Sequence, residues 1–152
     1  MDHPNRRRVL LAATGLGAAA LLAQFAARPA SATPDTAKAL LQSLAKGEPK
    51  EGRITIKAPE IAENGNAVPV TVSVDSPMTD KDYVKAIHVV SDGNPAPGVA
   101  SFMLTPLSGK AEVQLRVRMA STQKIIALAE MSDGSLWTLA REVKVTIGGC
   151  GG

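Results

Sequence analysis

The sequence predicts an all-β fold, an antiparallel β-sandwich of about seven strands. Apolar and polar residues alternate in residues 68–74, 111–117 and 143–147, as expected where successive side chains of a strand point to opposite faces of a sheet. Gly, Pro, Asn and Asp residues separate such runs at regular intervals, and this spacing is typical of turns between short strands. No long helical pattern lies between the runs. Together these observations favour the immunoglobulin-like class of sandwich.

The first 32 residues are predicted to be an export signal. Arg6, Arg7 and Arg8 precede a mildly apolar stretch rich in Ala, Leu and Gly, which ends at Ala30-Ser31-Ala32. A basic start, an apolar run and a small-x-small cleavage site are the three parts of a signal peptide. The paired arginines resemble a twin-arginine signal, so we expect cleavage after Ala32 and export to the periplasm by that route. A membrane anchor is the alternative, but a span needs roughly 20 strongly apolar residues.

Removal of this segment changes the charge of the chain. Four of the 17 basic residues and one of the 14 acidic residues lie in it, which leaves 13 of each in the remainder. The net charge of +3 therefore belongs to the signal. No basic patch with interleaved aromatic residues remains, so the composition argues against nucleic-acid binding.

Residues 33–47 are predicted to form a short amphipathic helix. Asp35 is a candidate N-cap, Leu40, Leu41 and Leu44 share one face, and Gly47 is placed to end the helix.

Residues 48–147 are predicted to form the sandwich. Besides the alternating runs, Ile54 and Ile56 mark a brief strand, and three segments that are apolar on both faces suit central strands: residues 84–90, 99–104 and 125–131. The chain has one cysteine and hence no disulfide between the sheets, so we expect a core of Val, Ile, Leu and Ala with Phe102 and Trp137 as its largest members. Pro69 is expected at a strand edge, because it cannot donate a ladder hydrogen bond.

Enzymatic motifs are scarce in this sequence. After the signal there is one histidine, His88, in an apolar strand, where a buried structural histidine is the expected role. The acidic residues are scattered and suit solvation or capping, and no phosphate-binding Gly motif or CxxCH haem motif is present. We therefore expect no catalytic residues, no metal site and no bound cofactor, and a protein that is not itself an enzyme.

The single cysteine, Cys150, lies in the terminal sequence GGCGG, between Gly148 and Gly149 on one side and Gly151 and Gly152 on the other. Glycine has no side chain and adopts most backbone conformations, so residues 148–152 are predicted to form a thin, flexible arm. Without a base or metal beside it in sequence, a thiol on such an arm is a poor catalyst but a suitable attachment point for a substrate, held as a disulfide or persulfide.

Other interpretations of the tail remain open. A glycine-rich end is often frayed, and an odd cysteine in an oxidising compartment often forms an intermolecular disulfide. The second case would make the chain an exported structural or adhesion sandwich crosslinked through Cys150. Diglycine-ended carriers, which are adenylated at their last Gly, are cytosolic, whereas the signal here points outside the cytoplasm.

The terminal GGCGG motif and five internal stretches resemble the SoxY family, the sulfur-carrier subunits of the bacterial thiosulfate-oxidising Sox system. The internal stretches are APEIAENG (58–65), VPVTVSV (68–74), DYVKAIHV (82–89), DGNPAPGVASF (92–102) and AEMSDGSLWT (129–138). The resemblance covers essentially the whole chain after the signal.

This resemblance implies a division of labour. Cys150 would carry sulfur as a cysteine S-thiosulfonate or persulfide, with residues 148–152 as the carrier arm. The stable partner would be a SoxZ-like subunit, in a heterodimer or a heterotetramer of two such pairs. The SoxAX haem protein would load the cysteine, the SoxB hydrolase would release sulfate, and the SoxCD dehydrogenase would oxidise the remaining sulfur. Haem and molybdenum would belong to these partners.

Overall fold

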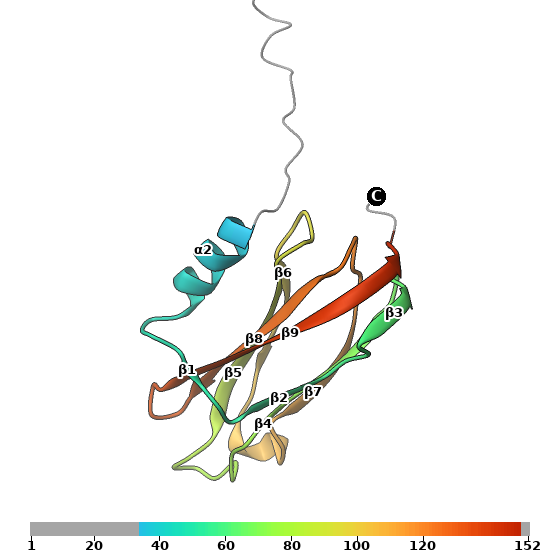
Figure 1. Ribbon diagram of the computed structural model, residues 1–152. Coiled ribbons are helices and arrows are strands. Elements are labelled where there is room, and N and C mark those ends of the chain that lie inside the picture. Colours follow the sequence, from blue (N-terminus) through green and yellow to red (C-terminus); the bar gives the residue numbers. More distant parts are fainter. Residues whose placement is uncertain (1–33, 150–152) are drawn as a thin grey trace, which may run out of the picture. The chain divides into compact units, whose positions relative to one another are not determined.

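Two β-sheets pack face to face in the computed structural model, which describes residues 34–149 (Figure 1). The predicted signal, residues 1–32, and the predicted attachment residue Cys150 with Gly151 and Gly152 lie outside the described residues. The larger sheet has the strand order β1-β9-β8-β5-β6, with β3 also paired to β9, and the smaller has the order β2-β4-β7. The strands are β1 (Lys50–Glu51), β2 (Ile54–Lys57), β3 (Ile61–Asn64), β4 (Val68–Val74), β5 (Val84–Ser91), β6 (Gly98–Met103), β7 (Glu112–Val117), β8 (Gln123–Met131) and β9 (Leu136–Ile147). The predicted sandwich is confirmed.

The alternating pattern of the smaller sheet forms half of the core. In β4 the side chains of Val68, Val70, Val72 and Val74 are all buried, while the residues between them are exposed or half-buried. Each fully buried Val contributes about 1.5–3 kcal/mol relative to an exposed one. This burial fixes which face of the strand points inward, since a shift of one residue would expose all four.

Strands β5 and β8 form the centre of the larger sheet and are buried on both faces over most of their length. Ile87 and Ile125 point into the core between the sheets. Leu128 is as deeply buried, at 1 % exposed, but lies outside that cluster, on the side lined by helix α2. The prediction of central or doubly packed strands is confirmed for residues 84–90 and 125–131. It is wrong for residues 99–104, because most of them form β6, an edge strand whose side chains are exposed or half-buried.

Helix α2 (Pro34–Leu44) lies against the outer face of the larger sheet (Figure 1). Leu40, Leu41 and Leu44 are half-buried and line the spaces between helix and sheet, as the amphipathic pattern predicts. The helix begins at Pro34, so Asp35 lies in its first turn rather than at the N-cap. Proline suits this position because its missing N–H would have no partner there.

Strand β9 is longer than predicted, and two of the strands that pair with it were not predicted. This strand is twelve residues long and pairs antiparallel with β8. The short strands β1 and β3, which the alternation did not predict, both pair with β9 in parallel. A strand of two or four residues has too few side chains to show a period, so local patterns do not predict it. The partner residues of β1 and β3, in β9, lie more than 80 residues away in the sequence.

The expectations for the large aromatic residues and for Pro69 are confirmed only in part. Phe102 and Trp137 are half-buried at the periphery of the core, whose most deeply buried side chains are smaller or unbranched. Pro69 lies in β4, which is the central strand of its sheet, but β2 pairs only with residues 71–74. Pro69 therefore has a paired neighbour on one side alone, which is the local edge that proline needs.

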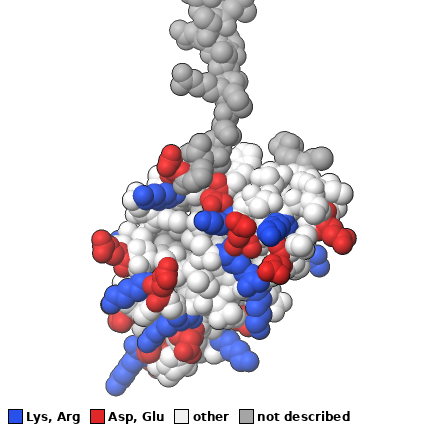
Figure 2. Space-filling view, viewed as in Figure 1, with Lys and Arg blue, Asp and Glu red and all other residues white. Residues whose placement is uncertain are grey.

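Charged side chains of both signs are interspersed over the visible face of the protein (Figure 2). In the part of the chain that the structure describes, no helix is long and apolar enough to cross a membrane.

Candidate functional site

Residues 148 and 149, the start of the predicted carrier arm, are attached to one end of the sandwich, where the chain leaves β9 (Figure 1). The Gly65 N–H donates to the Ile147 carbonyl at 2.8 Å, the Met119 N–H donates to the Gly65 carbonyl at 2.7 Å, and the Gly149 N–H donates to the Met119 carbonyl at 2.9 Å. These bonds join the turn after β3, the segment after β7 and the end of β9. We call this arrangement of Gly65, Met119 and residues 147–149 the arm junction.

The arm junction changes the expected role of Gly148 and Gly149. Both were predicted to belong to a flexible arm, yet Gly149 is buried and hydrogen-bonded and Gly148 is half-buried. Within the described residues, hydrogen bonding to the sandwich thus includes residue 149. The flexibility predicted for residues 148–152 remains an expectation for residues 150–152, outside the described range.

Glycine is required at the arm junction because three backbone segments approach closely. A Cβ on Gly148 would overlap the Ala120 carbonyl oxygen, and a Cβ on Gly65 would overlap the Met119 carbonyl oxygen. A Cβ on Gly149 would lie 2.8 Å from the Gly65 carbonyl oxygen. A carbon atom this close to a backbone oxygen forces the backbone to move. The lack of room for a Cβ therefore favours glycine at these three positions.

The segment after β7 is held in place by two amide side chains. The Asn94 amide donates to the Arg118 carbonyl at 2.6 Å and its oxygen accepts from the Ala120 N–H at 3.2 Å. The same oxygen accepts from the side chain of Gln123 at 2.9 Å, and the Gln123 oxygen accepts from the Gly93 N–H at 3.1 Å. Gln123 is only 5 % exposed, so loss of this network would leave polar groups buried without partners.

The sequence alone does not predict most of this site. Gly65 and Asn94 belong to the Gly, Asn, Asp and Pro residues expected between strands, and Gln123 has no distinguishing pattern. The available signal was weak: a glutamine at the start of an apolar strand, and a glycine between two asparagines. Neither pattern indicates that Gly65 and Gln123 lie near residues 147–149.

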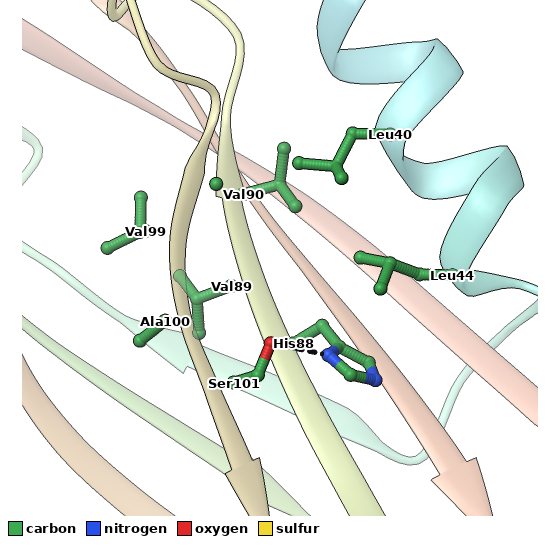
Figure 3. A pocket seen from close by; sticks show the side chains of 9 residues that line it. Leu40, Leu44, His88, Val89, Val90, Val99, Ala100 and Ser101 are labelled. Carbon is green, nitrogen blue, oxygen red and sulfur yellow. Dashed lines mark hydrogen bonds between the residues drawn. The ribbon is translucent and has the colours of Figure 1, made fainter.

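His88 occupies a second candidate position, in a cleft of about 280 Å³ between α2 and the larger sheet (Figure 3). Leu40 and Leu44 line its helix side, and Val90 and Ser101 come from the sheet. The Nδ1 atom of His88 lies 2.7 Å from the Ser101 hydroxyl. This confirms the expectation of a buried histidine with a satisfied hydrogen bond.

Burial lowers the pKa of His88, and the negative charge of Glu130 opposes this only in part. A neutral imidazole beside one hydroxyl, in an otherwise apolar cleft, is suited to packing the helix on the sheet. Among residues 34–149, no group of three or more His, Cys, Asp or Glu side chains is placed to hold a metal ion.

Comparison with known proteins identifies the family. The family model for sulfur oxidation protein SoxY matches residues 37–150, which include Cys150. The solved structure of the sulfur carrier protein SoxY from Chlorobium limicola f thiosulfatophilum is 40 % identical, with a TM-score of 0.61; the match covers 72 % of this chain and 96 % of that one. No curated protein matches the chain.

More distant structures share the fold. A superoxide reductase variant from Ignicoccus hospitalis is 21 % identical with a TM-score of 0.56, and the match covers 74 % of this chain and 92 % of that one. A putative superoxide reductase from Thermotoga maritima is 23 % identical with a TM-score of 0.54, covering 63 % and 87 % of the two chains. At this level of identity the likeness concerns the sandwich, and function follows from the residues placed on it.

Proposed function

Since the chain belongs to the SoxY family, we propose that it is a covalent carrier of sulfur intermediates in thiosulfate oxidation, with the thiol of Cys150 as the attachment point. The observation that carries this proposal is the family match, which spans the sandwich and reaches Cys150. The chain is then a substrate carrier rather than an enzyme, and its partners perform the chemistry.

The proposed loading step is an oxidation. The Cys150 thiolate and the sulfane sulfur of thiosulfate form a sulfur–sulfur bond, which gives a cysteine S-thiosulfonate and releases two electrons to a haem protein. Hydrolysis then breaks the bond between the sulfane sulfur and the sulfonate group. Water supplies the oxygen of the sulfate, two protons are released, and a persulfide stays on the cysteine. A thiolate is the reactive form in such exchanges.

The arm junction supports a carrier because it fixes the point from which the cargo extends. Gly149 is hydrogen-bonded to Met119, so the chain leaves the sandwich toward the proposed attachment residue from a defined place at one end. Several enzymes that bind this end would meet the same substrate without its release into solution, which keeps its effective concentration high.

The partners and location of the protein are part of the proposal. Membership of the family supports a role in the Sox system and a SoxZ-like partner. SoxAX, SoxB and SoxCD are proposed as the transient partners, and they would supply the haem and molybdenum. Residues 1–32 are proposed as a twin-arginine signal that leads to the periplasm.

Replacement of the thiol tests this function. Cys150→Ser is expected to leave the melting temperature and binding to the partner subunit unchanged, because serine differs from cysteine in a single side-chain atom. Sulfate formation from thiosulfate, measured with the partner enzymes, is expected to fall to background. Met103→Ser is the control, since it removes a sulfur atom from a side chain that is 72 % exposed on β6.

Sulfate formation at the unmodified rate by Cys150→Ser would rule out the carrier function. A stable disulfide between chains in cells, with no sulfur adduct, would instead favour the exported structural sandwich crosslinked through Cys150.

A further inference from the structure

The cleft between α2 and the larger sheet has the room and the lining of a small-molecule site. We call it the His88 cleft; Leu40 and Leu44 line its helix side, and His88, Val90 and Ser101 line its sheet side. Its volume is about 280 Å³, whereas an apolar cavity of about 150 Å³ already holds a benzene ring. No Lys, Arg, Asp or Glu is among the described residues that line it. Such a lining favours a ligand that is apolar and uncharged.

His88 places an unused hydrogen-bonding atom in this cleft. The residue is only 8 % exposed, and its Nδ1 atom lies 2.7 Å from the Ser101 hydroxyl. The other ring nitrogen, Nε2, has no hydrogen-bond partner in residues 34–149. Figure 3 shows the ring extending from β5 toward Leu44, with Nε2 on the side away from Ser101. Packing of the helix on the sheet accounts for the ring and for Nδ1, but leaves Nε2 without a role.

The state of the imidazole determines which ligand group fits Nε2. Burial keeps the pKa of His88 below its ordinary value, so the ring is neutral at about pH 7.5. The Ser101 hydroxyl can either donate to Nδ1 or accept from it, and Nε2 is then a donor or an acceptor, respectively. A hydroxyl group on the ligand fits both states, because it can donate as well as accept.

A second cleft, on the other side of α2, differs in this feature. Its volume is about 260 Å³, and Leu128 and Thr138 line its sheet side. The Thr138 hydroxyl already donates to the Ala127 carbonyl at 3.1 Å. The two clefts are thus similar in size and in position beside the helix, but the polar side chain on the sheet side is already satisfied in the second one. This makes the second cleft a control within the same molecule.

We infer that the His88 cleft is a binding site for a small uncharged molecule with an apolar body and one hydroxyl group, an alcohol or a phenol. The hydroxyl forms a hydrogen bond with Nε2 of His88, and the apolar body packs against Leu40, Leu44 and Val90. Ligand binding here is independent of the proposed carrier function.

Phenol and toluene are matched probes for this site, since they differ only in a hydroxyl in place of a methyl group. Their affinities are measured at about pH 7.5 by NMR titration of the isotope-labelled full chain, in which the shifted signals also locate the ligand. We expect phenol to bind with a dissociation constant of about 1 mM. It should shift the side-chain nitrogen signals of His88 and the amide signals of residues 98–101, which line the cleft.

Two variants separate the hydrogen bond from general apolar binding. In His88→Leu the phenol hydroxyl is buried without a partner, so the ratio of phenol affinity to toluene affinity should fall by at least about fivefold. Thr138→Val makes a similar exchange of a polar for an apolar side chain in the second cleft and should leave the ratio unchanged. Circular dichroism checks that both variants are folded.

A ratio that does not fall in His88→Leu, or that falls equally in both variants, would overturn the inference. The unmodified protein supplies an independent test that needs no variant to fold. A dissociation constant for phenol above about 10 mM, or shifts that centre on the residues of the second cleft, would also overturn it.

Discussion

A methyl group added at Gly148 tests whether the arm junction holds the base of the arm. In Gly148→Ala the new Cβ would overlap the carbonyl oxygen of Ala120. A backbone oxygen cannot rotate away as a side chain can, so the end of β9 must move instead. That movement breaks the hydrogen bond from Gly149 to Met119 and strains the bond from Gly65 to Ile147.

The loss of stability is limited by the two hydrogen bonds that Ile147 and Gly149 make at the arm junction. The net contribution of one backbone hydrogen bond is about 1 kcal/mol, so release of both bonds lowers the free energy of unfolding by about 2 kcal/mol. For a domain of this size, 1 kcal/mol corresponds to a shift of about 4 °C in the melting temperature, and we expect a fall of about 8 °C.

The assay is urea and thermal unfolding followed by circular dichroism. Gly47→Ala is the matched control, because its Cβ would meet only the side chain of Leu136 at an ordinary 3.7 Å, and its stability should stay within about 0.5 kcal/mol of the unmodified protein. Gly148→Ala as stable as Gly47→Ala would show that the glycines at the base of the arm are not required by close packing, and the reasoning would be refuted.

Three more changes have defined outcomes. Asn94→Ala removes the hydrogen bonds to the Arg118 carbonyl and the Ala120 N–H and should lower the free energy of unfolding by about 1–3 kcal/mol in urea titrations; stability within 0.5 kcal/mol of the unmodified protein would contradict the proposed support. The pKa of His88 is below its ordinary value in the folded chain, so the unfolded chain takes up a proton first and the melting temperature should fall between pH 7.5 and 5.5; His88→Gln should show a smaller fall, and an identical pH profile would disprove this linkage. Met119→Ala empties a fully buried position and should cost about 2–5 kcal/mol, measured by urea unfolding; a cost below 1 kcal/mol would mean that the core beneath the arm junction is not closely packed.

The fold followed from local patterns wherever a strand was long enough to show one. Strand β4 carries four buried valines at a spacing of two, and β5 and β8 are apolar on both faces because α2 lies against the outside of their sheet. Strand β3 offered only Ala62 as a buried side chain. Its pairing with β9 depends on hydrogen bonds to residues 144–147, which no local pattern encodes.

The candidate site was predictable in part. The placement of the single cysteine among four glycines predicts an attachment point at Cys150, which lies outside the described residues and stays a prediction. The reason for Gly148 could not be deduced, because it depends on the Ala120 carbonyl, 28 residues earlier in the sequence. The hydrogen bond between half-buried Asn94 and buried Gln123 likewise joins distant segments of the chain.

The central claim is that Cys150 carries sulfur, and the intact mass of the protein tests it most directly. The protein is purified without reductant from cells that are oxidising thiosulfate, and its mass is measured before and after reduction, with Cys150→Ser prepared in parallel. We predict a reducible added mass equal to a sulfane sulfur, a polysulfide or a thiosulfonate group, located on Cys150 by peptide mapping and absent from Cys150→Ser. A free thiol, or only a disulfide between two chains, in cells that are forming sulfate would contradict the claim.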